Sequence, residues 1–220
     1  MGAGVQGFEI SEAADNQGLL VVSGACDTVG VAGGFTQGGG HSPAASRFGL
    51  SADQALEWEV IDGCGRFHTA SRTLNTDLFW ALSGGGGGSY GVVWSLTVKA
   101  HADIPTSGAY LNFTSATTTQ DAFWKAVEAY HANLPILVDN GIETFYFVSS
   151  ATFEVAITGP GVSAERLKTL LIPSPTNYII ETSRPFPPST TTQDIMQCSM
   201  LFGALCKLKP RQKPRRSEVT

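Results

Sequence analysis

Residues 24–42 read GACDTVGVAGGFTQGGGHS, and residues 84–93 read GGGGGSYGVV. Glycine adopts backbone conformations with φ > 0 and lets a ligand touch the main chain directly. A loop kept only for flexibility does not need the spaced apolar residues Val29, Val31 and Phe35. Successive N–H groups in such a loop can also form a nest for an anion. The two glycine segments therefore predict a site for a large, flat cofactor with phosphate groups.

Composition alone would make residues 84–88 a flexible linker. The residues on either side, Phe79-Trp80 and Val92-Val93, are expected in the core. A tight helix-to-strand crossing beneath a cofactor ring is therefore the favoured interpretation. The segment lacks the Lys-Ser/Thr pair of a P-loop, so it does not indicate a nucleotide triphosphatase.

Three motifs extend this pattern in a fixed order. They are C-x-T-V-G-V-A-G-G-x-x-x-G-G-G-H-S at 26–42, S-R-x-G-L-x-A-D-x-x-L-E at 46–57, and D-L-F-W-A-L-x-G-G-G-G-G-x-x-G-V-V at 77–93. Together they resemble the berberine-bridge-enzyme-like FAD-linked oxidoreductases, which have the PCMH-type or vanillyl-alcohol-oxidase FAD-binding fold. The resemblance runs from about Val5 to about Ala102. Members of that family are much longer than this chain, so the resemblance implies a fragment.

The predicted fold class is α+β. The second half of a PCMH-type FAD-binding domain is expected over residues 1–103, followed by part of an α+β substrate-binding domain over residues 104–205. The boundary is placed at Asp103-Ile104-Pro105, because the pattern of expected elements after it changes to antiparallel strands and helices. Residues 206–220 are basic and interrupted by proline, which predicts a disordered tail.

Periodicity and turn residues place the individual elements. Before residue 104 we expect helices at 8–16 and 77–82, the second capped by Thr76, and strands at 19–22, 55–61, 66–70 and 92–99. In strand 55–61, Leu56, Trp58 and Val60 are expected to share one face. After residue 104 we expect strands at 109–114, 142–149 and 152–158 and helices at 118–133 and 163–171. A further helix is considered over 194–205.

The resemblance implies FAD as the cofactor. The residues expected to bind it are Cys26, Thr28, Val29, Gly30, Gly33, Gly34, Gln37, Gly38, Gly39, Gly40, His41, Gly91, Val92 and Val93. In the family, a cysteine at the position of Cys26 can form a thioether to the flavin; the alternative is a small buried apolar residue at the end of a strand. His41 could contact the cofactor. The alternative is that it only ends the loop, as a polar side chain hydrogen-bonded within the protein.

The function implied by the resemblance is FAD-dependent oxidation of an alcohol, a sugar or a secondary metabolite, with hydride transfer to the flavin and dioxygen as the electron acceptor. One alternative is a truncated, non-catalytic remnant of such an enzyme. Another is a Rossmann NAD(P)-binding protein, because residues 2–7 spell G-x-G-x-x-G. That fingerprint should follow a strand, and only Met1 precedes it, so residues 3–6 are better interpreted as the stub of a strand. The family's R-S-G-G-H-type segment, with its second flavin-linking histidine, does not occur in the chain, and no catalytic residue is assigned.

The resemblance implies a small-molecule substrate as the partner, and composition argues against two other classes of partner. The net charge of −5 argues against nucleic acid, which needs a basic face. There is no apolar run long enough to span a membrane. Four cysteines without a C-x-x-C pair predict no metal site, and His68, His101 and His131 are expected to be structural. No signal peptide is recognised at the N-terminus, but full-length members of the family are often secreted, so localisation stays open.

Overall fold

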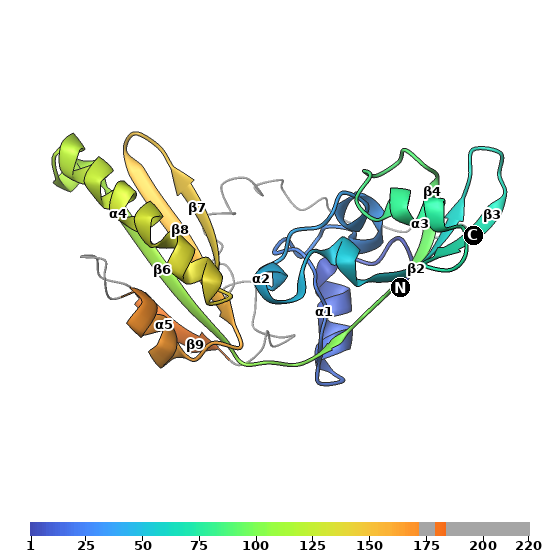
Figure 1. Ribbon diagram of the computed structural model, residues 1–220, viewed down its shortest axis with the longest axis horizontal. Helices are drawn as coiled ribbons and strands as arrows, with labels where there is room; N and C mark the ends of the chain where they lie inside the picture. The colour runs from blue at the N-terminus through green and yellow to red at the C-terminus, as the bar shows by residue number, and fades with distance from the viewer. Residues whose placement is uncertain (172–178, 184–220) are drawn as a thin grey trace, which may run out of the picture. The chain divides into compact units, whose positions relative to one another are not determined.

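The computed structural model describes residues 1–171 and 179–183 (Figure 1). The predicted α+β class is confirmed, because helices and antiparallel sheets alternate along the chain. Up to residue 102 the elements are α1 (Gly7–Asp15), β1 (Leu19–Leu20), the one-turn segment Val31–Phe35, α2 (Ala45–Phe48), the 3₁₀ turn Ser51–Gln54, β2 (Ala55–Ile61), β3 (Phe67–Ser71), α3 (Thr76–Leu82), β4 (Val92–Val98) and β5 (His101–Ala102). They are followed by β6 (Thr106–Thr114), the 3₁₀ turn Ser115–Thr117, α4 (Gln120–Asp139), β7 (Glu143–Val148), β8 (Thr152–Pro160), α5 (Ala164–Leu171) and β9 (Ile179–Ser183).

The first large sheet has the strand order β3-β2-β4, and β1 pairs separately with β5. Residues 1–3 extend the large sheet beyond β4, since Met1 and Leu96 exchange hydrogen bonds of 2.9 Å. One face of this sheet carries Trp58, which is fully buried together with Leu82 of α3. The Trp58 indole donates to the Ser83 hydroxyl at the end of α3 (3.2 Å), and this contact satisfies its only polar atom.

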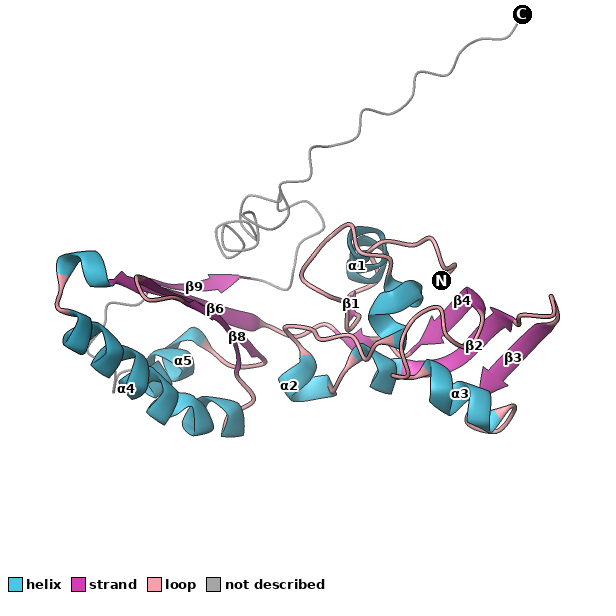
Figure 2. Ribbon diagram, turned by 90° about the horizontal axis from the view of Figure 1, so that it is seen from above, coloured by secondary structure: helices cyan, strands magenta, loops and turns pink. Residues whose placement is uncertain are grey.

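The second large sheet is antiparallel throughout, in the order β7-β8-β6-β9. Helices α4 and α5 lie on the same face of it (Figure 2). Beneath them, Phe153 packs against Phe113 and Tyr130 with ring centroids 5.0 Å apart in both cases. The apolar groups of the two large sheets thus form two separate clusters, one around Trp58 and one around Phe153.

The antiparallel strands overturn the Rossmann alternative. A dinucleotide-binding Rossmann fold requires a parallel sheet with the glycine fingerprint between its first strand and first helix. Here residues 1–3 pair antiparallel with β4, through the bridge between Gly2 and Ser95. Gly7, the last glycine of the apparent fingerprint, begins α1 and donates its N–H to the Val29 carbonyl (3.0 Å).

Some expectations about individual residues were wrong. Thr76 does not cap α3; the cap position is Asn75, with φ of 47°, and its side-chain amide donates to the Thr69 carbonyl instead (2.7 Å). Helix α4 continues through Pro135 to Asp139, although a proline inside a helix removes one hydrogen bond of the ladder. Burial of Leu137 in the next turn favours this continuation.

Three apolar side chains expected in the core are exposed: Leu56, Trp80 and Val92. In α3, Phe79 and Leu82 are buried against the sheet and Leu78 packs partly against the same cluster, whereas Trp80 is 79% exposed. In β4, side chains alternate, which places Val93 inside and Val92 outside. A register shift between Ala55 and Glu57 turns Leu56 outward and buries Ala55 in its place. The helix considered at 194–205 and the tail at 206–220 lie outside the described residues.

Candidate functional site

The start of the first glycine segment is held by the N-terminus of α1. Gly7 and Phe8 donate their N–H groups to the Val29 and Asp27 carbonyls, each at 3.0 Å. The Val29 N–H returns to the Cys26 carbonyl at 3.2 Å, closing a turn. These bonds fix the backbone of residues 26–29 and leave Cys26 partly exposed. Thr28 and Val29 are exposed on the same turn.

The middle of the segment is anchored from beneath by buried hydroxyl groups. Thr36 is fully buried, and its hydroxyl donates to the Val31 carbonyl (2.7 Å) and lies 2.9 Å from the Ser51 hydroxyl. The Gly40 carbonyl accepts from the Ser51 N–H at 2.9 Å, and that of Gly39 from the Ala52 N–H at the same distance. A side chain at Gly40, where φ is 75°, would also lie 2.6 Å from the Ser51 Cβ. The loop is therefore rigidly seated on the Ser51–Gln54 turn.

The two glycine segments cross directly against each other. The Gly86 N–H donates to the Gln37 carbonyl (2.8 Å). A Cβ atom on Gly87 would lie 2.7 Å from the Gly34 Cα, which only glycine at position 87 avoids. On Gly33 and Gly34, by contrast, an added Cβ would meet nothing within 4 Å. The crossing thus presents bare main chain with open space above it.

The other residues predicted to bind the cofactor divide by burial. Gln37 and Val93 are 4% and 6% exposed, so both lie beneath the surface of the loops, whereas Val92 faces outward. Gly30 precedes the turn at Val31–Phe35, and Gly38 packs against the Gly34 carbonyl. Gly91 has φ of 154° and packs on Val60. Their role in cofactor binding stays a prediction.

The geometry fits a group such as FAD. A planar ring system needs close approach to the main chain, which the open glycine backbone at positions 33 and 34 offers. The buried Gln37 side chain adds an acceptor, since its Oε1 has no hydrogen-bond partner among the described residues. A buried acceptor without a partner costs free energy, and a nearby donor would remove that cost.

His41 ends the first glycine segment and contacts a residue of the second large sheet. Its Nε2 lies 3.0 Å from Oε1 of Glu143, the first residue of β7. The His41 side chain is 63% exposed and that of Glu143 only 11%. Burial raises the pKa of Glu143 to about 7. The carboxyl group therefore changes charge near neutral pH.

This raised pKa predicts how stability depends on pH. The folded chain holds the Glu143 proton more tightly than the unfolded chain, whose value is near 4.5. The free energy of unfolding therefore contains the full stabilisation from this group below pH 4.5. That stabilisation decreases as the pH rises from 4.5 to 7 and does not change further above pH 7. We expect a loss of about 2 kcal/mol across this window, after allowance for solvent at the carboxyl. Urea unfolding at several pH values should show a flatter dependence in Glu143→Gln, and an unchanged dependence would contradict this assignment.

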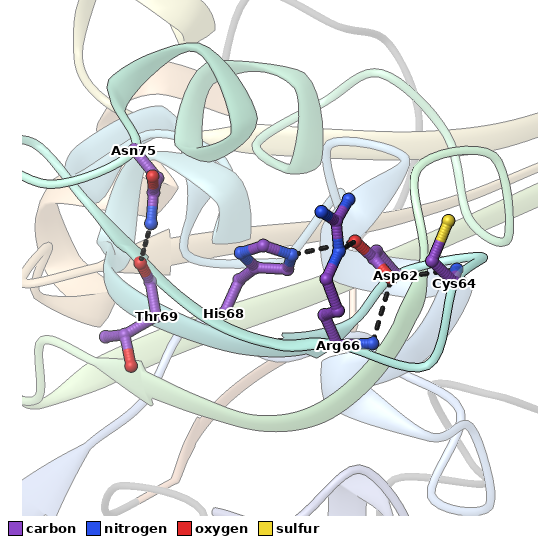
Figure 3. Close-up of polar contacts among 6 residues, drawn as sticks. All are labelled: Asp62, Cys64, Arg66, His68, Thr69 and Asn75. Atoms are coloured by element: carbon purple, nitrogen blue, oxygen red, sulfur yellow. Dashed lines mark hydrogen bonds and ion pairs between the residues drawn. The ribbon is translucent and has the colours of Figure 1, made fainter.

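A separate polar cluster holds the hairpin between β2 and β3 (Figure 3). The Asp62 carboxylate accepts from the His68 ring (2.8 Å), from the Arg66 Nε (2.9 Å) and from the backbone N–H groups of Cys64 and Arg66. The contact with His68, together with the other donors, holds the pKa of Asp62 well below its usual range. Every donor comes from the same hairpin, so the cluster shapes a turn.

The remaining histidines also have structural partners. His101 stacks on Phe48 (centroids 4.1 Å apart) and contacts the Gln54 Oε1 at 2.8 Å; burial, with Lys99 nearby, lowers its pKa. His131 lies 2.8 Å from the Val127 carbonyl. In the part of the chain that the structure describes, there is no cluster of three or more metal-ligating side chains. No helix among residues 1–171 is long and apolar enough to cross a bilayer.

Sequence reasoning missed Glu143 altogether. It was placed one residue inside a predicted strand, with nothing to distinguish it from a solvated carboxylate. The available signal was its alternation with Phe145 and Phe147, which places a carboxyl on an otherwise aromatic strand face. Its contact with His41 joins residues distant in sequence and is not visible in any local pattern.

Comparison with known proteins agrees with this geometry. Residues 1–71 match the FAD binding domain family. The chain is 49% identical over 174 residues to the FAD-linked oxidoreductase patO of Aspergillus clavatus, covering 79% of this chain and 30% of that protein. It is 44% identical over 173 residues to the VAO-type flavoprotein oxidase VAO615 of Thermothelomyces thermophilus, again covering 79% and 30%. The chain thus spans about a third of the length of these relatives.

Solved structures share the fold. The crystal structure of the VAO-type flavoprotein MtVAO615 from Myceliophthora thermophila C1 superposes with a TM-score of 0.80 at 40% identity, over 84% of this chain and 36% of that one. The BBE-like 1 protein of Physcomitrella patens superposes with a TM-score of 0.73 at 24% identity, over 89% and 45%. The second match shows the fold alone. The matched portions reach beyond residue 71, so the likeness includes the second large sheet.

Proposed function

We propose that this chain, which belongs to the VAO-type FAD-linked oxidoreductases, holds FAD on its two crossed glycine segments and forms part of an enzyme that oxidises an alcohol, a sugar or a secondary metabolite. The observation that carries this proposal is the crossing of Gly34 and Gly87, where bare backbone faces open space. When bound, FAD supplies the acceptor for the hydride that leaves the substrate carbon. The chain's own residues bind and orient that cofactor.

Each part of the loop has a distinct task in this proposal. Gly33 and Gly34 let the flat face of the cofactor approach the main chain. Thr36 and Ser51 hold the loop from beneath, so that the site is formed before the cofactor arrives. The buried Gln37 side chain lies beneath the loop, where its Oε1 has no hydrogen-bond partner among the described residues. Dioxygen is the proposed electron acceptor, and the word oxidase in the name of the relative VAO615 supports that choice.

Replacing Gly34 by alanine tests this function. The added methyl group meets no protein atom within 4 Å, so stability should stay close to that of the wild type. It projects into the space assigned to the cofactor, so the dissociation constant for FAD should rise at least about tenfold, or about 1.4 kcal/mol. Titration with FAD, followed by flavin fluorescence, measures this.

The matched control is Gly63→Ala. Gly63 lies in the β2–β3 turn, and its added methyl group also meets nothing within 4 Å. FAD affinity should be unchanged in this variant. Equal affinities for FAD in Gly34→Ala, Gly63→Ala and the wild type would show that the crossing of the glycine segments does not hold the cofactor.

The covalent link is a separate part of the proposal. Cys26 is partly exposed and is the first residue of the fixed turn at residues 26–29, so we expect its thiol to reach a ligand on the loop. We expect flavin to stay with the chain after denaturation, and Cys26→Ala to release it. Ser23→Ala is a suitable control, because Ser23 precedes the same turn. Complete release of FAD from the denatured wild-type chain would refute the link without touching non-covalent binding.

A further inference from the structure

Glu143 is a buried carboxyl group that the proposed cofactor site does not use. Its side chain is 11% exposed, and among the described residues its polar partner is His41. Burying a carboxylate is costly unless it is paired. The sequence nevertheless places it at the start of β7, where an apolar residue would pack without cost.

The face of the sheet around Glu143 is aromatic. The opposite face packs under the helices, since Tyr146 lies against Tyr130 and Phe153. Alternation then places Glu143, Phe145 and Phe147 together on the face away from α4 and α5. The two phenylalanine rings pack edge to face, with centroids 5.1 Å apart.

In the described part of the chain, few other charged residues lie near Glu143 in the register of the sheet or on neighbouring elements. Glu154 stands on the same face but is paired with Phe147, at the far end of β7. Glu181 occupies the same row of the sheet as Glu143, through Gly108 and Thr158. From α2, the Arg47 guanidinium donates to the Pro160 carbonyl (3.4 Å) near that row. Among the described side chains, His41 alone contacts the Glu143 carboxyl directly.

His41 connects this carboxyl to the glycine segment. It follows Gly40, whose backbone is fixed by the Ser51 N–H, so its position is set by the rigid part of the loop. The His41 Nε2 lies 3.0 Å from the Glu143 Oε1, so this contact joins the buried carboxyl to the loop that is proposed to hold the cofactor.

We propose that Glu143 and His41 form the acid–base pair of the oxidation, with Glu143 accepting the proton that the substrate hydroxyl loses. This rests on the proposed function. Oxidation of an alcohol breaks the C–H bond, whose electron pair leaves as hydride to the flavin oxidant, and the O–H bond, whose electron pair forms the carbonyl. The remaining proton passes to the Glu143 carboxylate, while His41 orients that carboxylate. A base is most effective when its pKa lies near the working pH, and that of Glu143 is about 7.

The first test follows the carboxyl group without any cofactor. The chain is labelled with ¹³C-glutamate, and the Glu143 resonance, assigned by its loss in Glu143→Gln, is titrated between acid and alkaline pH. We expect a midpoint near 7 in the wild type. The midpoint should move upward in His41→Gln, because the variant loses the side chain that stabilises the carboxylate. A midpoint near the ordinary value of 4.5, or no change in His41→Gln, would overturn the pairing.

The second test uses the FAD-loaded chain and needs no knowledge of the substrate. Added electrons on the flavin raise the proton affinity of a nearby carboxylate, and linkage requires the reverse effect on the flavin. We therefore expect the midpoint potential of the bound flavin, plotted against pH, to change slope near pH 7. The change should correspond to one proton taken up for every two electrons. Glu143→Gln should remove this change of slope, and the control Glu154→Gln should keep it.

The outcomes separate the two proposals. If FAD is bound and Glu143→Gln keeps the same change of slope, the acid–base role is overturned while cofactor binding stands. If the purified chain shows no bound flavin in its visible spectrum after incubation with FAD, the proposed function fails, and this inference fails with it. If the His41–Glu143 pair only holds the loop against the second large sheet, Glu143→Gln should leave the pH dependence of the flavin midpoint potential unchanged.

Discussion

Replacing Trp58 by alanine should lower the free energy of unfolding by about 3–5 kcal/mol, the range for a large aromatic side chain removed from a core. Trp58 is fully buried and anchors the apolar cluster of the first large sheet. Its indole also donates to Ser83, whose hydroxyl in turn donates to the Phe79 carbonyl at the end of α3 (2.8 Å). The variant loses both the packing and this link, which urea unfolding followed by circular dichroism measures.

Two further variants sharpen this result. Trp80→Ala is the matched control, because Trp80 is 79% exposed, and its effect should stay within about 0.5 kcal/mol. Phe153→Ala should destabilise the second sheet by an amount similar to that of Trp58→Ala in the first. If the chain divides near residue 103, as we propose, hydrogen exchange should show each core variant loosening its own sheet alone. Uniform loosening by either variant would contradict that division.

Replacing Gly87 by alanine should both destabilise the chain and abolish FAD binding. The new Cβ would stand 2.7 Å from the Gly34 Cα and 3.4 Å from the Gly34 nitrogen. Both are backbone atoms of a loop seated on Ser51, so they cannot move aside without breaking its hydrogen bonds. Overpacking of this kind costs about 1–3 kcal/mol.

The contrast with Gly34→Ala makes this prediction specific. The two glycines face each other, but only the Cβ of position 87 points into the contact. We expect a lower thermal midpoint in Gly87→Ala and an unchanged one in Gly34→Ala, measured by thermal unfolding without cofactor. FAD binding should be lost in Gly87→Ala and weakened in Gly34→Ala. Equal midpoints for Gly87→Ala and the wild type would show that the two glycine segments do not cross closely.

Much of the fold could be predicted because local signals and burial agreed. Strand 55–61 and the hairpin to β3 follow from alternation and a turn at Asp62. A tight connection from helix to strand at residues 84–88 was expected because Phe79 and Val93 on either side were placed in the core, and both do pack in one cluster. Where the prediction failed, tertiary structure decided which side chains are buried. A register shift in β2 turns Leu56 outward. The short helix α3 buries one face against the sheet, and Trp80 lies outside that face.

The site was less accessible to sequence reasoning than the fold. Motifs identified the glycine backbone that faces open space, but they could not separate Gly34, on the surface, from Val93, in the core. Nor could they find Glu143, because its contact with His41 depends on two segments that only the folded chain brings together. Local patterns report which residues can approach a ligand, and the environment that shifts a pKa comes from the tertiary structure.

The central claim is that the two glycine segments hold FAD, and equilibrium binding of FAD to the purified, folded chain tests it most directly. The chain is incubated with FAD, separated from free cofactor by gel filtration, and its visible absorbance is compared with its protein content. The account predicts one FAD for each wild-type chain, and none on Gly87→Ala. A folded wild-type chain that elutes colourless, with all the FAD in the small-molecule fraction, would contradict it.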